Sequence, residues 1–161
     1  MLRGVSNVES GYAGGPSTSS GQAPTYEQVS GGKTGHAEVI RVTYDPSVIT
    51  YEDLLTVFFG SHDPTTPNRQ GADVGEQYRS IILYQTEEEK AAAEKMVKEV
   101  NESLQDGTRV VTQVVRFGTF FKAEDYHQNY FKTNTSAPYC QIVIEPKIEK
   151  VKKRFAELVQ Q

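Results

Sequence analysis

Hydrophobic and polar residues alternate with a period of two in several parts of the chain, and this alternation predicts β-strands. The clearest run extends from His36 to Tyr44, where the pattern predicts a strand with both faces at least partly covered. Further strands are expected at Tyr78–Tyr84 and Val110–Val115, with a last edge strand at Ile142–Ile144. Residues Val5–Tyr12 mix small, apolar and polar groups, which indicates the last turn of a helix followed by a short strand.

Apolar residues recur at helical spacing in other segments. Thr50 offers an N-cap with Asp53 at the third helical position, and the helix that follows should end at Gly60. Thr86 and Glu89 have the spacing of a capping box, ahead of a longer helix that ends at an Asp-Gly turn. The remaining helical segments are expected at Tyr26–Val29, at Ala123–Phe131 and, as an amphipathic helix with a basic opposite face, at Lys147–Gln161.

The order of these elements predicts the fold class. Strands alternate with helices, while two stretches rich in glycine and proline, Gly14–Pro24 and His62–Gln77, indicate loops. This order favours an α+β fold, a two-layer sandwich of the ferredoxin-like kind with extra loops and a C-terminal helix. A length of 161 residues fits a single domain, residues 1–161, with one substantial core.

Composition narrows the classes of function. The 21 acidic and 17 basic residues give a net charge of −4, which argues against nucleic acid as the main partner. No apolar run is long enough to cross a membrane, and the first residues lack the apolar core of a signal peptide. The one cysteine, Cys140, excludes an intramolecular disulfide and a cysteine-rich zinc site. We therefore expect a cytoplasmic protein with no metal centre and no membrane partner.

Four short motifs are rich in acids, phenols or imidazoles, and three of them also contain glycine, as the loops of a functional site often do. They are Gly11–Gly15 (Gly-Tyr-Ala-Gly-Gly), Gly35–Glu38 (Gly-His-Ala-Glu), Gly71–Ser80 (Gly-Ala-Asp-Val-Gly-Glu-Gln-Tyr-Arg-Ser) and Ala123–Tyr130 (Ala-Glu-Asp-Tyr-His-Gln-Asn-Tyr). In order and approximate spacing they resemble the motifs of the A-type peptide methionine sulfoxide reductases. The resemblance runs from about Val5 to Tyr130, and it implies a ferredoxin-like architecture and the reduction of methionine S-sulfoxide.

Sulfoxide reduction requires a group that protonates the leaving oxygen. Glu38 begins an otherwise apolar strand, where partial burial would raise its pKa and keep a proton available. The simpler alternative is a glutamate at a strand edge that faces water, since glutamates are mostly exposed. The resemblance implies that Glu38 is the acid.

The reaction also requires an apolar contact for the methyl group and donors for the oxygen, which phenols provide together. Tyr12, Tyr78 and Tyr130 match tyrosines that line the sulfoxide pocket in the resembled family. From the residues alone, Tyr78 and Tyr130 are better explained as core aromatics with a hydroxyl at the surface, and the match to the family motifs reverses that preference. The family places a pocket aspartate at Asp73, which would hold a water or a peptide group; the alternative is a residue that satisfies its own turn.

The third requirement is an attacking thiolate. The family carries it in a Gly-Cys-Phe-Trp motif upstream of the first motif found here, but only ten residues precede Gly11 and none is Cys or Trp. We therefore expect an N-terminally incomplete form that lacks its first strand and its nucleophile and is inactive as written. Cys140 is either an inert buried residue or a thiol that recycles the nucleophile. His127 is either a structural histidine or a base for Cys140.

The resulting prediction is a protein-repair oxidoreductase that responds to oxidative stress. It would act on methionine S-sulfoxide, free or in oxidised proteins and peptides, with no bound cofactor and with thioredoxin or another dithiol as reductant. Two alternatives stay open. One is a catalytically dead module that binds methionine or its sulfoxide, and the other is a ferredoxin-like domain that binds a small molecule without redox chemistry.

Overall fold

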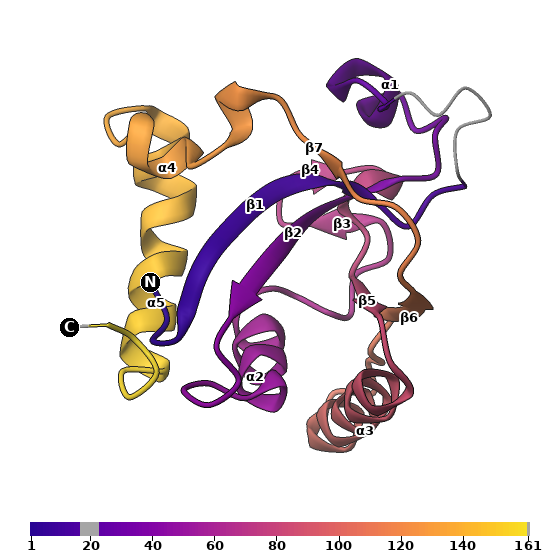
Figure 1. The fold of residues 1–161 in the computed structure, drawn as a ribbon, viewed down its shortest axis with the longest axis vertical. Helices are drawn as coiled ribbons and strands as arrows, with labels where there is room; N and C mark the ends of the chain where they lie inside the picture. Colours follow the sequence, from indigo (N-terminus) through magenta and orange to yellow (C-terminus); the bar gives the residue numbers. More distant parts are fainter. Residues whose placement is uncertain (17–22, 161) are drawn as a thin grey trace.

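The computed structural model describes residues 1–16 and 23–160 (Figure 1), so part of the expected Gly14–Pro24 loop lies outside the described residues. The strands are β1 (Val5–Ala13), β2 (Ala37–Tyr44), β3 (Arg69–Gln70), β4 (Asp73–Val74), β5 (Ile81–Tyr84), β6 (Gln113–Arg116) and β7 (Phe121–Lys122). The α-helices are α1 (Tyr26–Ser30), α2 (Tyr51–Ser61), α3 (Glu87–Ser103), α4 (Tyr130–Thr133) and α5 (Glu145–Arg154). Two 3-10 turns, η1 (Glu76–Tyr78) and η2 (Asp125–His127), and a π-helical turn, η3 (Cys140–Ile144), complete the described chain.

The strands form separate small sheets in the described part of the chain. β1 lies in the middle of a three-stranded sheet of order β2-β1-β7, antiparallel on both sides. In its register Tyr12 faces Glu38, and Ala13 and Ala37 form the last pair. β5 and β6 pair in parallel across helix α3, so residues 81–116 form a β-α-β unit. The fold is therefore α+β, as the sequence predicts.

The largest apolar cluster lies where the two longer helices meet the parallel pair. Leu55 of α2, Ile82 of β5 and Ala93 of α3 are buried at its centre. Side chains packed around them are Tyr51, Phe58, Phe59, Ala92, Met96 and Val114. Figure 1 shows α2 and α3 at one end of the molecule and α1 at the opposite end. Burying a side chain such as Leu55 stabilises the fold by about 1.5–3 kcal/mol, so we expect this cluster to contribute strongly to stability.

The chain termini lie together. Leu2 forms an isolated antiparallel bridge with Val159, and the backbone amide of Arg3 donates to the carbonyl of Leu158 at 2.8 Å. Helix α5 leads into this contact after Phe155, whose buried ring packs against Gly60 of α2. A β-carbon at Gly60 would lie 2.5 Å from that ring, so glycine is required there for the close approach.

Strands β5 and β6 begin at Ile81 and Gln113, later than the expected Tyr78 and Val110, and four further expectations about local structure are wrong. Residues Val5–Ala13 form one strand with no helical turn, because β1 pairs with β2 from its first residue, Val5, onward. Residues Ile142–Ile144 are helical: they belong to η3, which continues directly into α5. A short apolar run fits a strand or a helix equally well, and here the helix that follows decides.

The other two differences concern helix ends. The C-terminal helix begins at Glu145 and ends at Arg154, because the residues after Phe155 pair with the N-terminus. At the start of α3, the Thr86 hydroxyl accepts from the Glu89 amide, but the Glu89 carboxylate accepts from Gln85 N at 2.6 Å instead of completing a capping box. The capping box at Thr50 and Asp53 is present as expected.

Candidate functional site

Glu38 lies at the end of the β1–β2 ladder, beside the last pair of the register. It follows the buried residues His36 and Ala37 and retains solvent exposure itself. Crowding by surrounding protein atoms raises the pKa of Glu38, and the negative charge of Asp73 raises it further. The carboxyl therefore holds its proton to higher pH than an ordinary glutamate, as a general acid requires.

Asp73 and Tyr78 approach Glu38 from the loop that precedes β5. Asp73 begins β4 and Tyr78 ends η1, and both side chains are half-buried. Burial raises the pKa of Tyr78 to about 12, and the charge of Glu38 adds to the effect. Gly75 allows the sharp turn between them with a φ of 152°, a conformation that L side chains rarely adopt. The phenol is thus a hydrogen-bond donor beside the candidate acid.

Tyr12 is held in place by a hydrogen bond to Glu124. Its ring is buried, and its hydroxyl donates to Glu124 Oε2 at 2.7 Å. Glu124 Oε1 also accepts from the backbone amide of Tyr26 at 2.9 Å, at the start of α1. Burial raises the pKa of Tyr12 well above its usual range, and the bond to Glu124 raises it further. The proton of Tyr12 is committed to Glu124, although the phenol stays within electrostatic reach of Glu38.

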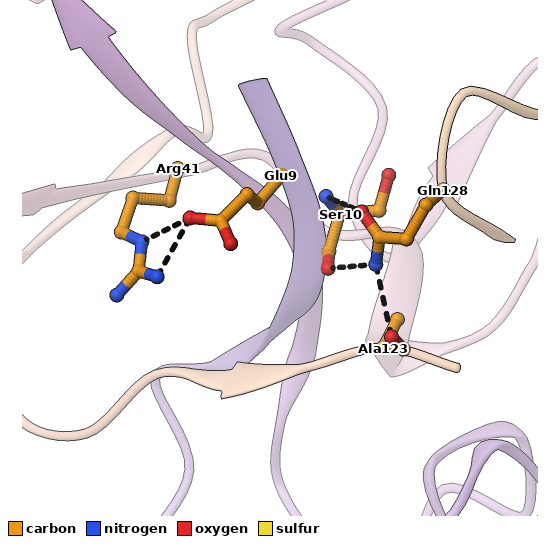
Figure 2. Close-up of polar contacts among 5 residues, drawn as sticks. All are labelled: Glu9, Ser10, Arg41, Ala123 and Gln128. Carbon is orange, nitrogen blue, oxygen red and sulfur yellow. Dashed lines mark hydrogen bonds and ion pairs between the residues drawn. The ribbon is translucent and has the colours of Figure 1, made fainter. Parts of the chain in front are cut away.

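A second side chain, Gln128, also fastens the segment that carries Glu124 and Tyr130 to β1, as Figure 2 shows. Gln128 Oε1 accepts from the amide of Ser10 at 3.0 Å, and Gln128 Nε2 donates to the carbonyls of Ser10 and Ala123, both at 2.9 Å. The side-chain amide of Gln128 thus provides hydrogen-bond partners for the backbone N–H and C=O of Ser10, just beyond the last residue of β1 that pairs with β7. It places Glu124 and Tyr130 on the side of β1 opposite β2.

Tyr139 joins the site, and the sequence-based reasoning missed it. Its hydroxyl donates to Asp73 Oδ2 at a long 3.4 Å. Burial raises the pKa of Tyr139, and the charges of Asp73 and Glu38 contribute, as does Tyr130. Tyr139 therefore contacts Asp73 and lies within electrostatic reach of Glu38 and Tyr130. The signal for Tyr139 in the sequence is its position directly before Cys140. Glu124 was missed as well, although it lies inside a recognised motif.

The one thiol is inaccessible. Cys140 is fully buried at the start of η3. His127 packs its ring against Tyr26 and Tyr126, with ring centroids 4.8 Å and 4.3 Å away. Its Nε2 atom finds no hydrogen-bond partner among the described residues. The described structure therefore contains an acid and several phenols, but no exposed thiol to attack a substrate.

Two further findings hold for residues 1–16 and 23–160. They contain no group of three or more His, Cys, Asp or Glu side chains arranged to hold a metal ion. No helix among them has the length and apolar character to cross a membrane.

Comparison with known proteins agrees with this geometry. Residues 1–159 match the family model described as peptide methionine sulfoxide reductase. A peptide methionine sulfoxide reductase MsrA from Sulfolobus acidocaldarius is 52% identical over 156 residues, which are 97% of this chain and 85% of that protein. The MsrA of Natronomonas pharaonis is 49% identical over 98% of this chain and 86% of its own length. The chain therefore belongs to the peptide methionine sulfoxide reductase family.

Solved structures give the same result. Mxr1 from Saccharomyces cerevisiae in reduced form superposes with a TM-score of 0.78 at 35% identity, over 85% of this chain and 76% of that one. Methionine sulfoxide reductase A of Corynebacterium diphtheriae superposes with a TM-score of 0.76 at 32% identity, over 83% of this chain and 66% of that one. The α+β fold and the assignment to this family of reductases are thus supported by both sequence and structure.

Proposed function

We propose that this chain binds methionine S-sulfoxide, free or within oxidised proteins and peptides, and supplies the proton donor for its reduction. The observation that carries the proposal is the raised pKa of Glu38 beside Asp73 and Tyr78. Tyr78 would donate a hydrogen bond to the sulfoxide oxygen, Glu38 would protonate it, and Asp73 with Tyr139 would hold a water or a peptide group. Tyr130 and the buried ring of Tyr12 would contribute the aromatic wall for the methyl group.

The chemistry needs a thiolate from another source. In the reduction, the thiolate sulfur bonds to the sulfoxide sulfur and the S–O bond breaks, so that the oxygen leaves as water with one proton from Glu38 and a second from solvent. Water then attacks the sulfur of the former thiolate, and the new S–S bond breaks with its electron pair going to the methionine sulfur. Methionine is released as the reduced product, a proton is lost, and the thiol is left as a sulfenic acid. A second thiol condenses with the sulfenic acid, losing water, and a dithiol such as thioredoxin reduces the resulting disulfide. Cys140 fits neither thiol role while it is buried, so these 161 residues alone should turn over no sulfoxide.

This requirement for thiols favours a reducing compartment, and we propose the cytoplasm. The physiological function would be the repair of oxidised methionine, with thioredoxin or another dithiol as partner and no bound cofactor. A second candidate function is a binding module without catalysis. A buried Cys140 leaves no thiol for turnover, while the polar side chains of the site could still bind a sulfoxide. These two features together favour the binding module.

A binding experiment tests the proposal. N-acetylmethionine sulfoxide methylamide of either sulfur configuration is titrated into the chain, with the unoxidised compound as reference. We expect the S-sulfoxide to bind more tightly than the R-sulfoxide and the thioether, and Glu38→Gln to weaken S-sulfoxide binding. Glu9→Gln is the matched control, because Glu9 is a carboxylate on the neighbouring strand paired with Arg41. Equal affinities for all three compounds would contradict the proposal.

Catalysis is tested separately with dithiothreitol as reductant. The chain as written should show no turnover of S-sulfoxide above the buffer rate. A version with a Gly-Cys-Phe-Trp segment and its flanking strand joined ahead of Met1 should gain turnover that is specific for the S-sulfoxide. An inactive extended version that still binds the S-sulfoxide would favour the binding module. Turnover by the original chain that survived Cys140→Ser would contradict the view that it lacks a usable thiol.

A further inference from the structure

One arginine connects the segments that carry the site. The side chain of Arg79 is half-buried and donates to four acceptors on different parts of the chain. Nη2 donates to the carbonyl of Gly35 at 2.9 Å and to that of Gly14 at 3.4 Å. Nη1 donates to the carbonyl of Glu76 at 3.1 Å, and Nε to Gln113 Oε1 at 3.2 Å. The guanidinium therefore joins the ends of β1 and β2 to η1 and β6.

The backbone is shaped to receive this side chain. The last pair of the β1–β2 ladder is Ala13 with Ala37. Gly14 directly follows Ala13, and Gly35 lies two residues before Ala37. Both glycines have positive φ angles, 79° and 68°, which L side chains rarely adopt. These turns direct both carbonyls at the same guanidinium. Arg79 thus holds the two strands together at the point where regular ladder pairing stops.

The hydrogen bonds of Arg79 to Gly14 and Gly35 lie next to the candidate site residues. Tyr12 and Glu38 form the pair just inside the bridged end, and Tyr78 is the residue directly before Arg79. Tyr12 and Glu38 come from the two paired strands β1 and β2, whereas Tyr78 comes from η1, which lies outside the ladder. A lysine would keep the charge but could not reach four acceptors, because its ammonium is a compact group whereas the guanidinium is a planar fork with five N–H donors.

We propose that Arg79 is a positioning residue for sulfoxide recognition. By holding the ends of β1 and β2 against η1, it keeps Glu38, Tyr12 and Tyr78 in the one arrangement that distinguishes the S-sulfoxide from the R-sulfoxide. The proposal rests on the proposed function of the same site. It assigns a role to a side chain that touches no substrate and acts through backbone carbonyls.

The test compares Arg79→Lys and Arg79→Met with Arg41→Met. Arg41 is the matched control: it also bridges β1 and β2, through Glu9 at 2.6 Å, and it covers the ring of Phe120, yet it lies farther along the ladder (Figure 2). Affinities for the S- and R-sulfoxides of N-acetylmethionine methylamide are measured under conditions in which circular dichroism shows each variant folded.

We expect both Arg79 variants to lose at least about tenfold in S-sulfoxide affinity, since small displacements of binding groups have effects of this size. Their preference for the S over the R isomer should fall toward one, while Arg41→Met stays within about twofold of the parent protein for both isomers. A general loss of stability would not change the preference between isomers. An unchanged preference in Arg79→Lys, or an equal loss in Arg41→Met, would overturn the proposal.

Amide hydrogen exchange provides a second measurement that needs no ligand. In Arg79→Met and Arg79→Lys, the amides of residues 11–13 and 37–39 should exchange faster, whereas those of α3 should not. Unchanged exchange at the ladder end would overturn the positioning role. If the parent protein binds neither sulfoxide, the proposed function fails, and the exchange rates still decide whether Arg79 positions this end of the sheet.

Discussion

The two ends of this molecule differ in how far polar contacts add to apolar packing. At the end where α2 and α3 meet the parallel pair, Leu55, Ile82 and Ala93 are buried in the larger apolar cluster. At the other end, a smaller cluster around Tyr12 is combined with hydrogen bonds from polar side chains: Glu124 holds Tyr12, and Gln128 holds Ser10. Apolar packing tolerates small shifts in position, but a hydrogen bond has a narrow range of length and angle. The first end therefore supplies stability and the second supplies geometry for chemistry.

The boundary between the two ends is itself polar. His62, which follows α2, has its Nδ1 atom 2.6 Å from the carbonyl of Phe58 and its Nε2 atom 2.7 Å from Ser80 Oγ. Ser80 Oγ lies 2.7 Å from Thr112 Oγ1. A carbonyl only accepts, so Nδ1 carries the proton and Nε2 accepts from Ser80 when the ring is neutral. Ser80 directly follows Arg79, so this network joins the apolar cluster to the segment that positions the site.

The largest expected effect concerns rate at the polar end. In the extended version that carries the Gly-Cys-Phe-Trp segment, Glu38→Gln should slow a single turnover by about a hundredfold to ten-thousandfold, the usual value of general acid catalysis. Tyr130→Phe should cost only about fivefold, because one neutral hydrogen bond contributes about 1 kcal/mol. Rapid-quench measurements of methionine formation provide the comparison. A larger loss in Tyr130→Phe would reject Glu38 as the acid.

The next effect concerns stability at the apolar end. Leu55→Ala should lower the free energy of unfolding by about 2–5 kcal/mol, because it removes buried methyl groups and leaves a cavity. Ile40→Ala on the exposed face of β2 is the control, since Ile40 is 62% exposed and should change stability by no more than about 0.5 kcal/mol. Urea denaturation measures both. Equal losses in the two variants would mean that the α2–α3 cluster is not the main source of stability.

A smaller effect is expected for the pair that fastens Tyr12. Tyr12→Phe removes the hydroxyl that donates to Glu124 and should cost about 1 kcal/mol of unfolding free energy. Tyr126→Phe is the control, because the Tyr126 side chain is exposed. In the same urea experiment it should leave the midpoint unchanged. A Tyr12 variant as stable as the parent would show that this hydrogen bond only orients the ring.

The smallest expected effects are changes of folding stability with pH. His62 and Glu38 should change stability in opposite directions as pH rises. Burial lowers the pKa of His62 in the folded protein. As pH falls below about 6.5, His62 is therefore protonated in the unfolded chain before it is protonated in the folded protein. Folding stability is lost over this range, until the pH reaches the pKa of His62 in the folded protein. Crowding and Asp73 raise the pKa of Glu38, so stability is lost as pH rises from about 4.3 through the folded pKa.

Urea midpoints measured from pH 4 to pH 8 test these signs, and each group changes stability by at most about 1.4 kcal/mol per pH unit. Glu38→Gln should therefore be more stable than the parent near neutral pH and should lose that advantage in acid. His62→Gln should be less stable at neutral pH but should flatten the decline in acid. A parent-like pH profile in both variants would show that neither group is perturbed in the folded protein.

Much of the local structure follows from the sequence by itself. The alternation of β2, the capping box at Thr50 and the helical spacing of α3 are local properties, so propensity and pattern were sufficient to predict them. The four short motifs also identified the family, because their residue types and order can be read without coordinates. Glu38, Asp73 and Tyr78 could be named as candidate site residues for the same reason.

The tertiary structure decided what depends on contacts between distant segments. Tyr12 donates to Glu124, 112 residues away in the sequence, and Arg79 reaches carbonyls 65 and 44 residues away. No local pattern encodes such pairings, since each depends on which strands become neighbours. The same reason explains the structure near the two chain termini. β1 is a strand from Val5 onward because β2 pairs with it, and α5 ends at Arg154 because the residues that follow pair with the N-terminus.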